Sequence, residues 1–134
     1  MGVMVLVTEG GKFLLAKCAK RNRIHGKWIA MSGTIEEGET PEQTAVREMK
    51  EELNIEPRNF EKLGRVRGEI DPVLHVFRTD ATGMEITPDE RELSDLRAFT
   101  REEALKLDLG RGTRRVFEDL LNGDGVNSAD VRGR

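Results

Sequence analysis

The stretch GTIEEGETPEQTAVREMKEELNI, residues 33–55, is the most informative part of this sequence. It holds seven glutamates in 23 residues, with only two cations to offset them. Its middle has the pattern of a helix start, because Thr40 suits the N-cap, Pro41 the first helical position and Gln43 the capping box. The sequence therefore predicts a helix that begins after Thr40 and carries an unusual density of negative charge.

The side chains of this helix separate into two stripes when about 100° of rotation is assigned to each residue. The apolar stripe predicts the buried face and consists of Ala45, Val46, Met49 and Leu53. Beside it runs an acidic stripe, formed by Glu48, Glu51 and Glu52. One interpretation of the acidic stripe is a solvated face, which is what most charge runs on helices are.

An acidic stripe of this kind is unfavourable by itself. Like charges three or four residues apart on a helix repel by roughly 0.2–0.5 kcal/mol per pair. Anions in the last turn also meet the negative end of the helix dipole, which disfavours them by roughly 0.3–1 kcal/mol each. A divalent cation reverses both effects, since hard ions such as Mg²⁺ bind clustered carboxylate oxygens. The stripe therefore indicates a metal site.

The spacing of the segment resembles the Nudix box, G-x5-E-x7-R-E-U-x-E-E-x-G-U, where U is a bulky aliphatic residue. Gly33 stands at its start, and its charged positions are filled by Glu39, Arg47, Glu48, Glu51 and Glu52. The departure is Asn54, which stands where the family has glycine. Because asparagine tolerates the left-handed conformation that ends a helix, we expect the loop after the helix to be preserved.

The resemblance implies an α/β fold, namely an α/β/α sandwich with a mixed sheet and a loop-helix-loop catalytic motif. It also implies hydrolysis of a diphosphate linked to another group, with Mg²⁺ or Mn²⁺ as the cofactor. The metal ligands that it implies are Glu48, Glu51, Glu52 and the backbone at Ser32 or Gly33. The catalytic residues that it implies are the same three glutamates and Glu92 from a later loop, with Glu90 as the alternative to Glu92.

Other residues of the matching region are expected to shape the site. The resemblance makes Glu39, Arg47 and Asn54 structural, and Arg47 can pair with Glu51 one turn along the helix and orient the carboxylates. Trp28 is a candidate for stacking on a nucleobase, although a large aromatic residue between a strand and a loop is more often buried in a core. Both interpretations of Trp28 stay open on the sequence.

The rest of the chain predicts a single Nudix-like domain over residues 1–122. Apolar runs predict strands at residues 2–8, 12–19, 60–70, 73–79 and 93–99, the first two joined by a hairpin at Gly10-Gly11. Helices are expected at residues 101–107 and 112–121. The last residues, 123–134, are rich in Gly, Asn and Asp, so a disordered tail is expected there.

Composition narrows the choice of partners. The formal net charge is −3 and the pI is near 5.5, so no stable nucleic-acid complex is expected. The apolar run at residues 3–7 is too short to span a membrane, and the lone cysteine, Cys18, cannot form an internal disulfide. These features predict a cytoplasmic monomer or homodimer that acts on a nucleotide small molecule.

Three functions are compatible with the motif. The stretches GKWIAMSGTIEEGE and LDLGRGTRR are similar to those of Nudix nucleoside triphosphatases, which release a monophosphate and pyrophosphate. The first alternative is hydrolysis of ADP-ribose or of a nucleotide sugar. The alternative of another class is a non-catalytic Nudix fold that binds a nucleotide, but such proteins usually lose box glutamates and this chain keeps them all.

Overall fold

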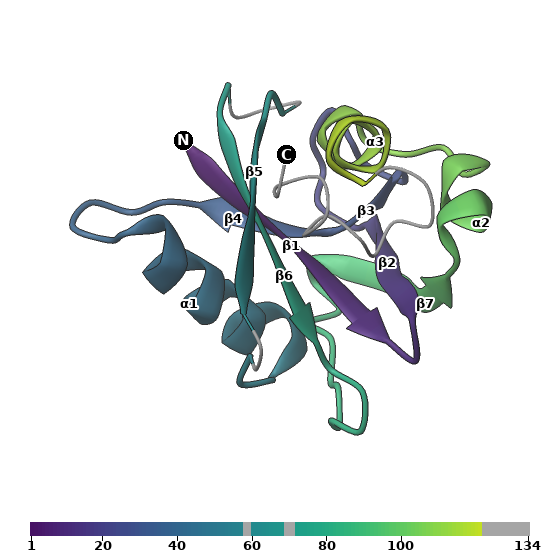
Figure 1. Ribbon diagram of the computed structural model, residues 1–134, viewed down its shortest axis with the longest axis horizontal. Coiled ribbons are helices and arrows are strands. Elements are labelled where there is room, and N and C mark those ends of the chain that lie inside the picture. Colours follow the sequence, from purple (N-terminus) through teal and green to yellow (C-terminus); the bar gives the residue numbers. More distant parts are fainter. Residues whose placement is uncertain (58–59, 69–71, 122–134) are drawn as a thin grey trace, which may run out of the picture.

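The computed structural model of the 134-residue chain describes residues 1–57, 60–68 and 72–121 (Figure 1). Its strands are β1 (Gly2–Glu9), β2 (Lys12–Cys18), β3 (Trp28–Ile29), β4 (Met31–Thr34), β5 (Glu61–Val66), β6 (Leu74–Asp80) and β7 (Leu93–Phe99). Its helices are α1 (Pro41–Leu53), α2 (Arg101–Leu105), α3 (Arg111–Arg115) and the π-helical segment η1 (Val116–Leu120), which continues α3. The tail expected at 123–134 lies outside the described residues.

Three elements differ most from the sequence prediction, and one of them, the helix expected at 101–107, ends at Leu105. The strand expected at 60–70 is shorter, because β5 ends at Val66. The helix expected at 112–121 begins one residue earlier, at Arg111, and changes to π-helical hydrogen bonding from Val116. None of the described helices is both long and apolar enough to cross a membrane.

The strands form one mixed sheet in the order β3-β2-β1-β6-β5, which confirms the expected sheet type. Strand β1 runs parallel to β6 and antiparallel to β2 and β4, while β7 pairs with β2. One edge of β1 changes partner along its length, since residues 7–9 pair with β2 and residues 2–5 with β4. Strands β2 and β4 therefore diverge, and residues from both line the cleft described below.

The turn between β1 and β2 is the predicted hairpin. Gly10 and Gly11 both have positive φ, 58° and 81°, as a type I′ turn requires of its two central residues. A residue with a Cβ is strained in this conformation, so the glycine pair explains why the hairpin closes here.

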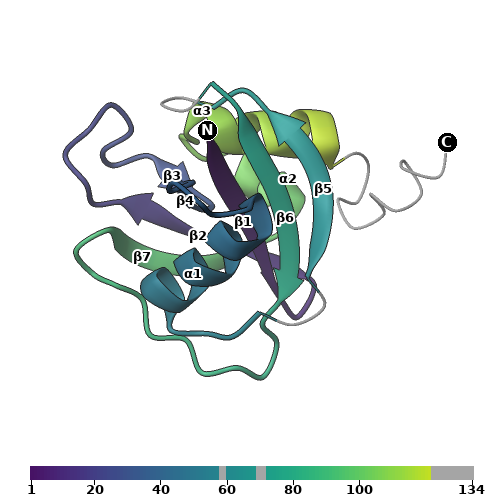
Figure 2. The same ribbon diagram turned by 90° about the vertical axis from the view of Figure 1, so that its left-hand side faces the viewer.

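Alternate residues of β1 enter two cores, because successive side chains of a strand point to opposite faces. Val3 packs in a core with Met49 of α1. Met4 packs in a second core with Phe117 of η1. Figure 2 shows α1 on one face of the sheet and α2 and α3 on the other. The α/β/α arrangement is therefore confirmed.

Helix α1 begins and ends as the sequence predicts. The hydroxyl of Thr40 accepts a hydrogen bond from the Gln43 amide at 3.1 Å, and the Gln43 side chain accepts one from the Thr40 amide at 2.9 Å. Asn54 closes the helix with φ 58° and ψ 41°, which is the left-handed conformation. The asparagine thus takes the backbone conformation expected of the family's glycine.

The predicted buried face of α1 is wrong at Val46. This residue is 41% exposed, whereas Glu48 and Glu52 are only 8% and 3% exposed. Ala45 and Glu52 lie two turns apart on the same side of the helix, and both are buried. A face centred on them leaves Val46, about 100° away, outside its edge. The helix therefore turns two carboxylates, and not this valine, toward the protein interior.

Candidate active site

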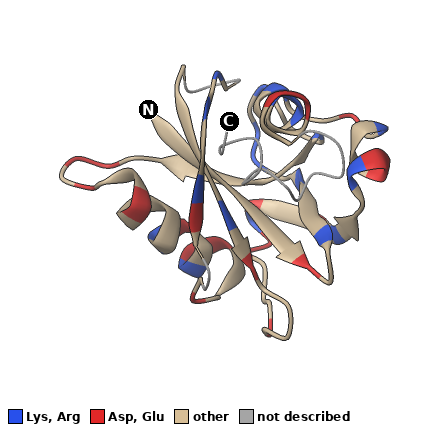
Figure 3. Cartoon of the chain, in the orientation of Figure 1, with Lys and Arg blue, Asp and Glu red and all other residues tan. Residues whose placement is uncertain are grey.

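The acidic segment brings its glutamates to the sheet through a close contact between Gly33 and Glu48. Gly33 lies in β4, against which α1 packs. A Cβ on residue 33 would overlap the carboxylate of Glu48, so only glycine allows this approach. The contact places the backbone of Ser32 and Gly33 beside the Glu48 side chain. Figure 3 shows the acidic residues that gather in the loop before α1 and along the helix.

Glu48 and Glu52 form a buried pair of carboxyl groups. Burial, and then the charge of Glu48, raise the pKa of Glu52 to about 10. Burial also raises the pKa of Glu48. Oε1 of Glu52 is buried and has no hydrogen-bond partner in the structure. Because unpaired buried carboxylates are costly, this arrangement calls for a cation between or beside the two groups.

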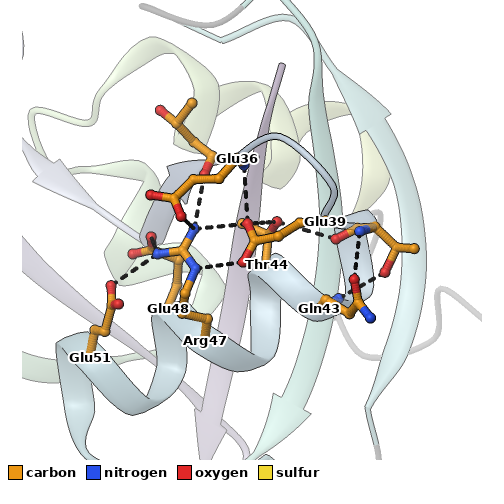
Figure 4. A network of polar contacts seen from close by, with 9 residues as sticks. Glu36, Glu39, Gln43, Thr44, Arg47, Glu48 and Glu51 are labelled. Carbon is orange, nitrogen blue, oxygen red and sulfur yellow. Dashed lines mark hydrogen bonds and ion pairs between the residues drawn. The ribbon is translucent and has the colours of Figure 1, made fainter.

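Arg47 connects the loop before α1 to the glutamates of the helix (Figure 4). Its guanidinium donates to both carboxylate oxygens of Glu39, at 2.7 and 3.0 Å. It also donates to Glu48 at 3.0 Å, to Glu51 at 3.1 Å and to the Thr34 carbonyl at 3.1 Å. Arg47 therefore holds one oxygen of Glu48 in place and ties it to β4. The expected pairing of Arg47 with Glu51 is present.

Glu39 is the main anchor of this arginine. The hydrogen bonds from Arg47, and then from the Thr44 hydroxyl at 2.7 Å, lower the pKa of Glu39 to about 2. The Glu36 amide donates to the same carboxylate at 3.0 Å. Glu39 is thus held ionised in a network of donors, which agrees with the supporting role expected of it.

The loop before β7 brings Glu92 to the same place. Asn54 donates from its side chain to the Thr87 carbonyl at 2.8 Å, and the Asp89 amide donates to the Glu52 carbonyl at 2.8 Å. These bonds fix the loop to the end of α1. The charge of Glu92 contributes to the raised pKa values of Glu48 and Glu52. Asn54 therefore supports the site through its side chain as well as its backbone.

A cleft between β2, β4 and the start of α3 lies beside the acidic pair, and Glu52 lines it whereas Glu48 and Glu51 do not. Ser32, Gly33, Glu52 and Glu92 line it, whereas Glu90 lines a separate depression beside β7. The cleft also contains residues that the sequence prediction did not single out for the site, namely Cys18, Lys20, Asn22, Ile24, Arg111 and Thr113. Several of them belong to the basic runs AKRNRIHGK and GRGTRR, but charge alone does not reveal that both runs meet one cleft.

Trp28 does not itself line this cleft, although its carbonyl accepts a hydrogen bond at 2.9 Å from the amide of Gly110, which does. It is 8% exposed, and its ring meets Phe99 edge to face with 5.1 Å between the ring centroids. Lys17 and Arg97 lie over the ring, 5.6 and 5.7 Å from its centroid. The structure therefore surrounds Trp28 with core and cationic side chains, and this environment matches the packing interpretation.

The donors in and beside the cleft fit a hard divalent cation. They are oxygen atoms: the unpartnered Oε1 of Glu52, the Glu48 carboxylate and the adjacent backbone at Ser32 and Gly33. Glu51, by contrast, is half-exposed and paired with Arg47. Within residues 1–57, 60–68 and 72–121, no three Asp, Glu, His or Cys side chains are grouped closely enough to hold a metal. A metal would therefore need backbone or substrate oxygens in addition to Glu48 and Glu52.

Comparison with known proteins indicates the same family as the motif does. The family profile of the NUDIX domain matches residues 1–120. The NAD-capped RNA hydrolase NudC of Pseudomonas aeruginosa is 32% identical over 119 residues, which cover 88% of this chain and 42% of NudC. The chain thus spans less than half the length of the curated relatives that it matches.

Solved structures share the fold. The MutT NUDIX hydrolase from Burkholderia pseudomallei superimposes with a TM-score of 0.77 at 25% identity, covering 89% of this chain and 95% of the other. The NUDIX domain of Shewanella oneidensis NrtR, complexed with ADP ribose, superimposes with a TM-score of 0.75 at 19% identity, covering 99% and 87%. From its box, its fold and these matches, the chain belongs to the Nudix hydrolase family.

Proposed function

We propose that this chain is a metal-dependent pyrophosphohydrolase that cleaves the diphosphate linkage of a nucleotide derivative. The observation that carries the proposal is the buried Glu48 and Glu52 pair, of which Glu52 has an unpartnered oxygen and lines a cleft together with Gly33. A fold that only binds a nucleotide has no need to bury two carboxyl groups together. The same pair is suited to a cation that the reaction requires.

Each residue of the site has its own role in the proposed reaction. Glu48 and Glu52 would hold Mg²⁺ or Mn²⁺, with a backbone oxygen of Ser32 or Gly33 as a further ligand. A cation held there would neutralise charge on the phosphate and lower the pKa of the attacking water. Glu92 lines the cleft, and we assign it the role of the base that would accept a proton from that water. Glu51 keeps one carboxylate oxygen on Arg47, and its other oxygen would serve as a further ligand or base.

Arg47 acts through Glu48. Its hydrogen bond occupies one oxygen of that carboxylate, and its bonds to Glu39 and Thr34 fix the direction from which it approaches. The other Glu48 oxygen accepts none of these Arg47 hydrogen bonds, which leaves it for a cation. Arg47 and Glu39 therefore orient the ligand without contacting the substrate.

Nucleoside triphosphates, cleaved to a monophosphate and pyrophosphate, are the first substrate class that we propose. The support is the similarity of the box region to Nudix triphosphatases and a cleft that combines carboxylates with Lys20 and Arg111 at its walls. Ammonium and guanidinium groups bind phosphate oxygens. A triphosphate offers more of these oxygens than a diphosphate does.

The similarity to NudC favours a second class, a dinucleotide diphosphate such as NAD, free or at the end of an RNA. ADP-ribose presents the same linkage. An RNA end could be processed in passing, so this class does not require the stable nucleic-acid complex that the net charge argues against. The two classes differ in the products that they release.

The experiment is a hydrolysis screen with the full chain and Mg²⁺ over nucleoside triphosphates, NAD, ADP-ribose and nucleotide sugars, with products separated by chromatography. Pyrophosphate as a product supports the first class, and two nucleoside monophosphates from NAD support the second. Glu52→Gln serves as the control in every assay. Nucleotide binding without hydrolysis in the parent would instead support the non-catalytic fold and overturn the proposal.

A further inference from the structure

Lys20 lies at the mouth of the cleft, directly after β2. Its ammonium is 3.2 Å from a carboxylate oxygen of Glu92, and both residues line the cleft together with Glu52. The Lys20 side chain is 53% exposed, so its end can move without disturbing a core. The Lys20 ammonium, which can move, therefore lies at the part of the cleft that Glu52 and Glu92 line.

The backbone holds Lys20 in this position. The Ala19 amide donates to the Glu92 carbonyl at 2.8 Å, which joins the loop after β2 to the loop before β7. The Lys20 carbonyl accepts from the Asn22 amide at 3.0 Å and lies 2.9 Å from Nδ1 of His25. The meeting of Lys20 and Glu92 is therefore built into two anchored loops, unlike a chance pairing of flexible side chains.

The charge of Lys20 acts on more than its hydrogen-bond partner. Partial burial alone would lower the pKa of Lys20, yet the pKa is raised, because Glu92, Glu52 and Glu48 all favour the ammonium form. Lys20 in turn favours ionisation of Glu52. Arg47 offsets the charge of Glu48 from the opposite side. Lys20 thus offsets the negative charge of Glu52 and Glu92, as Arg47 offsets that of Glu48.

We propose that Lys20 is a displaceable counter-cation: its charge opposes binding of the divalent metal at Glu52, and when it leaves Glu92 it binds a phosphate oxygen of the substrate. The inference rests on the proposed metal-dependent function. The lysine ammonium is a compact charge on a flexible stem, so it can leave one carboxylate and meet an anion nearby. Lys20 is therefore a positioning residue that weakens metal binding in the free protein and strengthens substrate binding in the loaded one.

An ordinary surface ion pair would behave differently. Pairs of this kind contribute little to stability, and their loss leaves a metal site elsewhere unchanged. Lys27 offers the matched control, since it lies in the same loop and pairs with Asp108 at 3.1 Å. Neither Lys27 nor Asp108 lines the cleft. A general loss of positive charge from the loop can therefore be separated from the loss of Lys20.

The test is the Mn²⁺ dissociation constant of the full chain without substrate, measured by calorimetry for the parent, Lys20→Met, Lys20→Arg and Lys27→Met. We expect Lys20→Met to bind Mn²⁺ roughly five- to tenfold more tightly, the effect of one nearby unit charge removed. Lys20→Arg and Lys27→Met should remain within about twofold of the parent. In EDTA, Lys20→Met should melt a few degrees lower than the parent.

Unchanged or weaker Mn²⁺ binding by Lys20→Met would overturn the role of Lys20 while leaving the metal-dependent function standing. Absence of Mn²⁺ binding by the parent would overturn both. Once a substrate is known, its KM should rise about tenfold in Lys20→Met at saturating Mn²⁺, while kcat changes less, because the lost contact is to a bound phosphate. An unchanged KM would remove the second half of the proposal.

Discussion

Gly33 lies so close to Glu48 that a Cβ on residue 33 would occupy the space of the Glu48 carboxylate. The first glycine of the box thus contacts the central glutamate of the box, where α1 packs against β4. The glycine is required for space, because its φ is not among the positive values of the chain. This contact sets where the carboxylate, and any metal bound to it, can stand.

Gly33→Ala should displace the Glu48 carboxylate and reduce activity about a hundredfold or more, while the fold persists, since the overlapping atoms belong to a side chain that can turn away. Mn²⁺ binding should weaken in parallel. The control is Ser32→Ala, which keeps the backbone oxygen and should stay near the parent. Parental Mn²⁺ affinity in Gly33→Ala would show that Glu48 does not ligate from this position.

The limits of α1 could be predicted from the sequence because they depend on local chemistry. Thr40 and Gln43 satisfy each other's amides, and asparagine at position 54 tolerates the left-handed conformation, so both signals can be recognised from neighbouring residues. The burial of Glu48 and Glu52 could not be predicted in this way. Hydrophobic periodicity assigns Val46 to the core because it assumes that carboxylates stay in water, and at this site they do not.

The pairing of Lys20 with Glu92 is a second feature that could not be predicted from the sequence. Glu92 lies far along the chain from Lys20, and the two meet only because β2 pairs with β7 and the adjoining loops share the hydrogen bond between Ala19 and Glu92. A basic loop and an acidic loop each look solvated when read alone. Long-range pairing of this kind leaves no local signal, so it appears only once the sheet order is known.

Asn54→Gly should change the free energy of unfolding only a little. Glycine accepts the left-handed conformation without strain. The remaining cost, about 1 kcal/mol, is the lost hydrogen bond from the Asn54 side chain to Thr87. Asn54→Val loses the same bond and adds roughly 1–3 kcal/mol of backbone strain, since a β-branched residue resists positive φ. Urea melts of both variants measure the difference. Equal midpoints would mean that the helix end can rearrange around residue 54.

Glu48→Gln and Glu52→Gln should each lower turnover by orders of magnitude and leave the fold intact. In EDTA both variants should be at least as stable as the parent, because a neutral amide is buried without the proton uptake that folding requires of a carboxyl group with a raised pKa. Mg²⁺ should raise the melting temperature of the parent and of neither variant. Thermal melts with and without Mg²⁺, run beside rate measurements, test this. Near-parental turnover in either variant would remove that residue from the ligand set.

The pH dependence of stability separates two groups of glutamates, because their pKa values move in opposite directions. Glu39 is lowered from 4.5 to about 2, so its stabilising contribution is present above pH 4.5 and is lost as the pH falls toward 2. Glu39→Gln should flatten this acid limb in urea melts. A limb that persists in the variant would assign it to other carboxylates.

Glu52 governs the opposite limb in the metal-free protein. Its pKa is raised from 4.5 to about 10, so the folded state holds a proton that the unfolded state has already released. The contribution is complete below pH 4.5 and is lost progressively as the pH rises toward 10. In EDTA, stability should therefore fall between pH 5 and pH 9, and Glu52→Gln should abolish most of the slope.

Saturating Mg²⁺ should also reduce the slope of stability against pH in the parent, since the cation stabilises the ionised pair and replaces the proton. Urea melts at several pH values, with EDTA or Mg²⁺, measure all three curves. A parental slope that Glu52→Gln leaves intact would place the titrating group elsewhere, and a slope that Mg²⁺ leaves intact would mean that the metal does not bind at the buried pair.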